Sequence, residues 1–146
     1  MDKEQRMAFN QRNIAEFRAS GGRIASFGDA PVLLLTGTGA KSGLPRTSPM
    51  MYLADEDDPN RVYVFASAAG SDTNPTWFNN LVEKPTGVTV EIGRETLTAD
   101  AEVLPEPIRE QIYAVQAGRY PGFAGYQART SRLIPVVALT LHRERR

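Results

Sequence analysis

The chain has 146 residues with 17 basic and 17 acidic side chains, so its formal net charge is zero. This length fits one domain with a buried core, and the balanced charge gives no support for a nucleic-acid partner. The sequence contains no cysteine and one histidine, which excludes disulfides and thiolate metal sites and argues against zinc. We therefore expect no metal centre.

The first segment, "DKEQRMAFNQRNIAEFRAS", predicts a helix that ends at the glycine pair following it. Met7, Ile14 and Phe17 form a narrow apolar stripe on this helix. The stripe either packs on the body of the protein or contacts a partner or a membrane surface. Because neither a signal peptide nor a membrane-spanning run is evident, we expect a cytoplasmic location, with peripheral membrane association through the helix as the alternative.

The stretch "LLLTGTGAKSGLPR", residues 33–46, resembles a phosphate-binding loop but matches neither the P-loop motif nor the dinucleotide-binding motif. A P-loop needs glycine directly before the lysine, where this chain has Ala40, and the dinucleotide fingerprint needs its third glycine where this chain has Ser42. The extended segment that follows predicts a strand–turn–strand connection. Lys41 and Arg46 on such a turn could bind an anion, or they could simply be exposed charges.

The rest of the chain alternates strands with few helices. Strands are predicted at 31–37, 46–54, 61–68, 87–93, 95–104 and 134–142, helices at 72–84 and 106–118, and a loop or short irregular helix at 119–132. Asn74 is the expected N-cap of the first of these helices. Hairpin-linked strands dominate, so we predict a mainly β (α+β) fold, an antiparallel β-barrel with peripheral helices.

Catalytic groups are scarce, which suggests that an enzyme of this sequence would depend on a cofactor. Besides the Lys41 turn, two clusters could form a site. In "FASAAGSDTNPTW" small residues would let a flat ligand approach the backbone, although the segment could be an ordinary connection with Trp77 in the core. Tyr120, Phe123 and Tyr126 recur every three residues and form an aromatic stripe that either lines a site or packs in the core.

Three stretches together resemble the deazaflavin-dependent nitroreductase family of actinobacterial oxidoreductases. They are "LLLTGTGAKSGLPRTSPMMYL", "VFASAAGSDTNPTWFNNL" and "RYPGFAGYQARTSRLIPVV", and the similarity runs from about Pro31 to Leu139. The resemblance implies a split β-barrel of the flavin-reductase type in 23–146, preceded by an N-terminal helix in 1–22. It also implies that the barrel binds reduced coenzyme F-420, an 8-hydroxy-5-deazaflavin.

The resemblance also implies roles for individual residues. Lys41, Ser42 and Arg46 would hold the phosphate and oligoglutamate tail. The deazaflavin ring would lie along Pro49, Met50, Ala66 and Ser67, with Asn74, Trp77 and Asn80 beside the ring and ribityl chain. Tyr120 and Tyr126 would close over the substrate, and the Ser67 and Tyr126 hydroxyls would hydrogen-bond to its carbonyl or to the developing anion.

The activity implied is hydride transfer to an apolar conjugated electrophile, such as a quinone or an α,β-unsaturated lactone or ester. Two alternatives remain open: a flavin mononucleotide enzyme of the same barrel type, and a non-catalytic deazaflavin-binding protein. Relatives that reduce nitroimidazoles tend to carry tyrosine at the positions of Met51 and Phe123, and members of the family often carry basic residues at the positions of Ala40 and Ala68. Their replacement predicts a more apolar pocket and a weaker grip on the cofactor tail.

Overall fold

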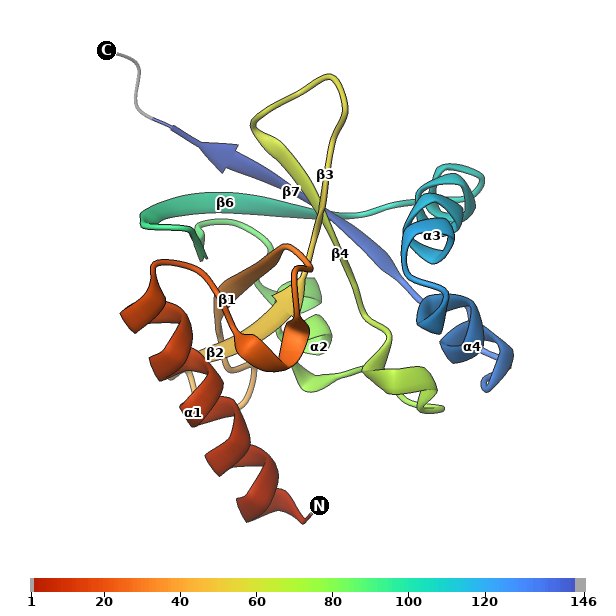
Figure 1. Cartoon of the computed structure of the whole chain (residues 1–146). Helices are drawn as coiled ribbons and strands as arrows, with labels where there is room; N and C mark the ends of the chain where they lie inside the picture. The colour runs from red at the N-terminus through yellow and green to blue at the C-terminus, as the bar shows by residue number, and fades with distance from the viewer. Residues whose placement is uncertain (1, 144–146) are drawn as a thin grey trace.

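The computed structural model describes residues 2–143. Residue 1 of the predicted N-terminal segment 1–22 and residues 144–146 of the predicted barrel 23–146 lie outside this range. Four α-helices and two short 3-10 helices surround one sheet (Figure 1). The helices are α1 Lys3–Ser20, η1 Ala25–Phe27, η2 Ala68–Gly70, α2 Thr76–Glu83, α3 Ile108–Arg119 and α4 Gly122–Ala128. The strands are β1 Val32–Thr38, β2 Pro45–Met51, β3 Leu53–Ala54, β4 Arg61–Phe65, β5 Val88–Ile92, β6 Glu95–Val103 and β7 Val136–His142.

The sheet is a curled, partly closed barrel. Its seven strands follow the order β2-β1-β5-β6-β7-β4-β3, and every pair is antiparallel. The two end strands, β2 and β3, are separated in the chain by Tyr52 alone. The sheet must therefore curl until its two edges approach each other, which is the geometry of a split barrel. The predicted antiparallel barrel with peripheral helices is confirmed.

The apolar run of β1 is unbroken because both faces of this strand are covered. Leu33 and Leu35 point into the barrel, where they join the main hydrophobic cluster. Val32 and Leu34 point outward and pack against Ile14 of α1. Because side chains alternate along a strand, a strand that is covered on both faces needs apolar residues at every position.

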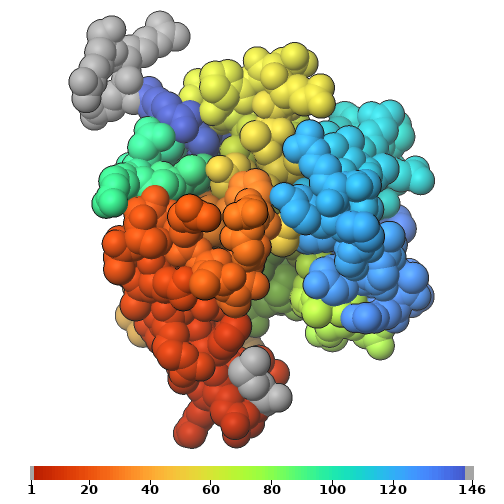
Figure 2. Space-filling view, viewed as in Figure 1, coloured from red at the N-terminus to blue at the C-terminus, as the bar shows by residue number. Residues whose placement is uncertain are grey.

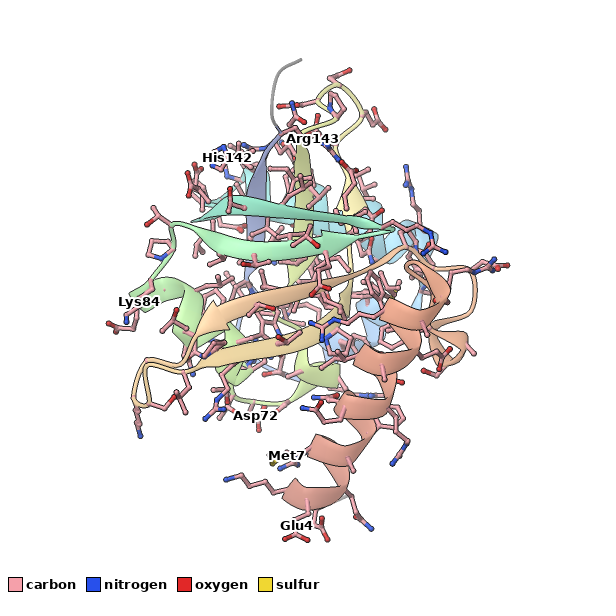
Figure 3. The ribbon with its side chains drawn as sticks, turned by 90° about the vertical axis from the view of Figure 1, so that its left-hand side faces the viewer. Glu4, Met7, Asp72, Lys84, His142 and Arg143 are labelled. Carbon is pink, nitrogen blue, oxygen red and sulfur yellow. The ribbon has the colours of Figure 1, made fainter. Side chains whose placement is uncertain are left out.

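Helix α1 is fixed to the body through its second half. Asp2 and Gln5 form a capping box at its start, and Gly21 ends it in the left-handed conformation. Phe17 is 1% exposed, whereas Met7 is 58% exposed. Figure 3 shows Met7 on the part of α1 that extends beyond the sheet. The predicted apolar stripe therefore packs on the body only in part.

The start of α2 differs from the prediction. Pro75, not Asn74, occupies the N-cap position, and no side chain caps the helix. The amide oxygen of Asn74 instead accepts a hydrogen bond of 2.8 Å from Nη1 of Arg132. A long-range partner has taken the amide that local sequence rules assigned to the cap. The aromatic segment after α3 forms the short helix α4.

Candidate functional site

The β1–β2 connection is a tight turn, as predicted. The N–H of Gly39 donates to the carbonyl of Leu44 over 2.8 Å, and the N–H of Gly43 donates to the carbonyl of Gly39 over 2.9 Å. A Cβ on Gly39 would lie 2.5 Å from Oγ of Ser42, so a larger residue there would require the serine side chain to move. The Ser42 hydroxyl accepts from the N–H of Leu44 over 3.2 Å and thus helps to shape the turn.

Lys41 and Arg46 are both exposed on this turn. Neither forms an ion pair or a side-chain hydrogen bond with any residue in the range 2–143. Their positive charges therefore face solvent, without an intramolecular carboxylate to neutralise them. Two exposed cations on one turn can bind an anionic group, the arginine through paired hydrogen bonds and the lysine as a point charge.

Asn80 connects this turn to helix α2. Its side chain is 6% exposed, and its Oδ1 accepts from the N–H of Ala40 over 3.0 Å. The structure therefore places Asn80 beneath the turn that carries Lys41. Trp77 lies one turn earlier on the same helix, where it is partly buried against the main cluster and edge-on to Phe78.

The residues expected along the deazaflavin ring lie on different faces of the sheet. Pro49 pairs with Leu34 on the face toward α1, whereas Met50 is 8% exposed and belongs to the barrel core. Ala66, at the end of β4, is fully buried in the same core. Of these residues, Pro49 keeps a partly exposed side chain, while Met50 and Ala66 can offer a ligand little beyond their backbone.

A cavity of about 510 Å³ opens between the N-terminal segment and α4. Figure 2 shows the surface hollowed between these orange and blue regions. The two predicted tyrosines, Tyr120 and Tyr126, both line the cavity, and so does Met51 from the end of β2. Other lining residues come from the η1 loop and α4: Ser26, Phe27, Asp29, Ala30, Gly122 and Phe123.

Phe123 belongs mainly to the core. It is 7% exposed and meets Phe65 with ring centroids 5.6 Å apart. Tyr113 helps to hold α4 in place, because its buried hydroxyl donates to the carbonyl of Phe123 over 2.5 Å. Burial also raises the pKa of Tyr113 to about 12, so this hydroxyl stays protonated at neutral pH. The aromatic stripe therefore combines both interpretations: its middle residue is core, and Tyr120 and Tyr126 face the cavity.

Ser67 begins a turn of unusual backbone conformation beside α4. Ala68 and Ala69 have φ values of 44° and 52°, a left-handed region that alanine rarely adopts. Ser67 is partly exposed but does not line the cavity that Tyr120 and Tyr126 share. Sequence reasoning missed the residue that holds this turn, Arg132, because a lone arginine in a polar loop has no local signature.

Comparisons with known proteins identify the family and the fold. Residues 10–141 match the family model described as F420H(2)-dependent quinone reductase. The F420H(2)-dependent quinone reductase Rv1261c of Mycobacterium tuberculosis is 37% identical over 134 residues, which cover 86% of this chain and 85% of that protein.

Two solved structures share both fold and sequence. One, described as an F420-H2 dependent reductase (FDR-A), has a TM-score of 0.65 at 35% identity and covers 75% of this chain and 93% of its own. Another, described as a domain-swapped dimer, has a TM-score of 0.67 at 33% identity and covers 88% of this chain and 95% of its own. The fold and family expected from the three sequence motifs are confirmed, and the chain belongs to the F420H(2)-dependent quinone reductase family.

Proposed function

We propose that this protein reduces a quinone, or another conjugated electrophile such as an α,β-unsaturated lactone or ester, at the expense of reduced coenzyme F-420. Its family membership makes it an F-420-dependent oxidoreductase. The observation that supports this choice of acceptor is the cavity of about 510 Å³ in which Tyr120 and Tyr126 meet Met51. Mostly apolar walls with a few hydroxyl groups suit a flat molecule that carries carbonyl oxygens.

We assign the acidic tail of the cofactor to Lys41 and Arg46, with Ser42 on the same turn. The arginine can bind a phosphate or carboxylate through two parallel hydrogen bonds, whereas the lysine acts as a point charge. Pro49, Met50, Ala66, Ser67, Asn74, Trp77 and Asn80 remain our proposed neighbours of the ring and ribityl chain. For Asn80 the role is indirect, because its amide already holds the Ala40 N–H.

We assign the substrate to the cavity lined by Tyr120 and Tyr126. When bound, the reduced deazaflavin supplies a hydride. The protein has to hold the acceptor close to the ring, keep water out and stabilise the negative charge that develops on the acceptor oxygen. The hydroxyls of Ser67 and Tyr126 are the proposed donors to that oxygen. Either Tyr126 or water delivers the proton.

Two measurements test this function. Purified protein is titrated with oxidised deazaflavin and with flavin mononucleotide, and we expect binding of the deazaflavin at low ionic strength. Preferential binding of flavin mononucleotide would favour the alternative enzyme of the same barrel type. Turnover of the reduced cofactor with menadione then separates an enzyme from a non-catalytic deazaflavin-binding protein, and a panel of quinones and unsaturated lactones ranks the acceptors.

We also propose a peripheral role for the exposed half of α1. Among residues 2–143, no helix has both the length and the apolar character needed to cross a membrane. Met7 and Phe9 nevertheless expose 58% and 36% of their surface. A cytoplasmic protein with such a helix could meet an apolar acceptor at a membrane surface. Sedimentation with lipid vesicles, compared with a Met7→Gln, Phe9→Gln variant, tests this contact.

A further inference from the structure

The guanidinium group of Arg132 is the centre of a network of four hydrogen bonds. It donates to the backbone carbonyls of Ala66, Ser67 and Ser71 over 3.2, 3.0 and 2.8 Å, and to Oδ1 of Asn74 over 2.8 Å. All four acceptors lie in the connection between β4 and α2. Arg132 itself comes from the loop after α4, about 60 residues later in the chain.

This network holds a turn that would not be stable by itself. Ala68 and Ala69 adopt the left-handed conformation, which is unfavourable for any residue other than glycine. Such strain persists only where the surroundings fix the backbone, and it concentrates at functional sites. The carbonyls of Ala66 and Ser67 precede the two strained alanines, and that of Ser71 follows them after Gly70. Arg132 thus fixes both ends of the turn.

The same contacts determine where the backbone donors of the turn point. In a trans peptide the N–H points opposite to the carbonyl. Because the Ala66 and Ser67 carbonyls point at Arg132, the N–H groups of Ser67 and Ala68 point away from it. Within residues 2–143, neither N–H has a hydrogen-bond partner, and the two residues are partly or fully exposed. Two adjacent donors are therefore left for a ligand.

The turn is also fixed to the helix that carries Tyr126. A Cβ on Gly70 would lie 2.8 Å from the carbonyl oxygen of Tyr126, so the two backbones are in direct contact. Nε2 of Gln127 donates to the carbonyl of Arg132 over 2.6 Å. Oγ1 of Thr130 donates to Asp72 over 3.1 Å. These links join the β4–α2 connection, α4 and Arg132 into one unit.

We propose that Arg132 is a positioning residue, which holds the N–H groups of Ser67 and Ala68 toward an oxygen of the bound ligand and sets their place relative to Tyr126. The oxygen is either a carbonyl of the cofactor ring or the anion that develops on the acceptor. Both accept hydrogen bonds from preorganised backbone donors. The inference rests on the proposed function, because it assigns a further part of the same site.

The first test compares Arg132→Lys with Arg119→Ala, which removes an exposed arginine that makes no side-chain hydrogen bond within residues 2–143. Lysine keeps the charge but cannot bridge four acceptors. We expect cofactor affinity or kcat to fall by about tenfold or more in Arg132→Lys and to stay unchanged in Arg119→Ala. A weaker Kd for oxidised deazaflavin indicates a cofactor oxygen, and a lower kcat with menadione at unchanged Kd indicates the acceptor. In the protein without ligand, amide NMR shifts of 66–71 and 126–129 should change together.

A second pair of variants removes one donor without touching Arg132. Ser67 has φ −76°, which proline adopts readily, so Ser67→Pro deletes the N–H, and Ser67→Ala is the control for the lost hydroxyl. We expect Ser67→Pro to lose binding or turnover beyond Ser67→Ala by about tenfold. Equal behaviour of the two variants, or an Arg132→Lys protein with wild-type binding and turnover, overturns the proposal. A wild-type protein that neither binds nor uses the deazaflavin would instead refute the proposed function.

Discussion

The N–H of Ala40 donates to Oδ1 of Asn80 over 3.0 Å, and this bond ties the β1–β2 turn to helix α2. Without the amide, the turn would lose the anchor next to Lys41. We therefore predict that Asn80→Ala weakens deazaflavin binding severalfold and lowers the free energy of unfolding by about 1 to 3 kcal/mol. Asn79→Ala, one residue away and exposed, is the control. Weaker binding without any loss of stability would indicate a direct ligand contact instead.

The cations of the turn should act mainly through charge. Arg46→Ala and Lys41→Ala are each expected to weaken cofactor binding by about 1 kcal/mol, which is roughly fivefold. The loss should shrink as ionic strength rises, because salt screens exposed charges. Calorimetric titration at low and high salt measures it, and Lys84→Ala, an exposed lysine on the far end of α2, serves as the control. Equal affinity of all three variants and the wild type at low salt would rule out the assigned anion site.

The sequence predicted the fold well because the strands carry their own signals. The run Val32–Leu35 is apolar at every position, and the glycine turns between strands fall where hairpins need them. The family motifs also led to Tyr120 and Tyr126, which do share a cavity. These signals did not indicate on which face of the sheet each side chain lies. Met50 turned out to lie in the barrel core, and strand alternation would have separated it from Pro49.

Long-range polar contacts were the other part that the sequence did not predict. Asn74 has every local property of an N-cap, yet its oxygen bonds to Arg132, 58 positions later. The conformation of Ala68 and Ala69 was equally hidden, because alanine itself favours other regions of φ and ψ. Both features depend on a partner that only the folded chain brings close. Local rules can locate such residues but cannot identify what they contact.

A buried amide in α3 offers a test of stability. Gln116 is fully buried, and neither Nε2 nor Oε1 has a hydrogen-bond partner in residues 2–143. Replacing it with methionine, which has a similar shape, should raise the free energy of unfolding by about 1 to 3 kcal/mol. Thermal unfolding measures the change, with exposed Gln111→Met as the control that stays within about 0.5 kcal/mol. A destabilised Gln116→Met protein would mean that the amide binds a buried water.

The turn before β4 should make the stability of the protein depend on pH. Hydrogen bonds to the Asp55 carboxyl lower its pKa. The largest effect comes from the Tyr63 hydroxyl, and smaller ones come from the N–H groups of Asp57 and Asp58. Since the pKa is lower in the folded state, the stabilisation is present above about pH 4, the unfolded value, and disappears as the pH falls through the folded pKa. Asp55→Asn should thus lower the Tm at neutral pH, and the difference should shrink below about pH 4. Asp57→Asn, the control, should follow the wild type throughout.

Tyr126 lines the cavity, and removing its hydroxyl tests the proposed chemistry most directly. Tyr126→Phe keeps the ring that packs on Phe123 at a centroid distance of 5.3 Å, so stability should change little. If the hydroxyl stabilises the developing anion, kcat with menadione should fall by about tenfold to a hundredfold while the Kd for deazaflavin stays unchanged. Tyr52→Phe removes the hydroxyl of a partly buried tyrosine that lines a different cavity, and it should leave turnover intact. Wild-type kcat in Tyr126→Phe would leave water as the proton donor and transfer the stabilising role to the turn at Ser67.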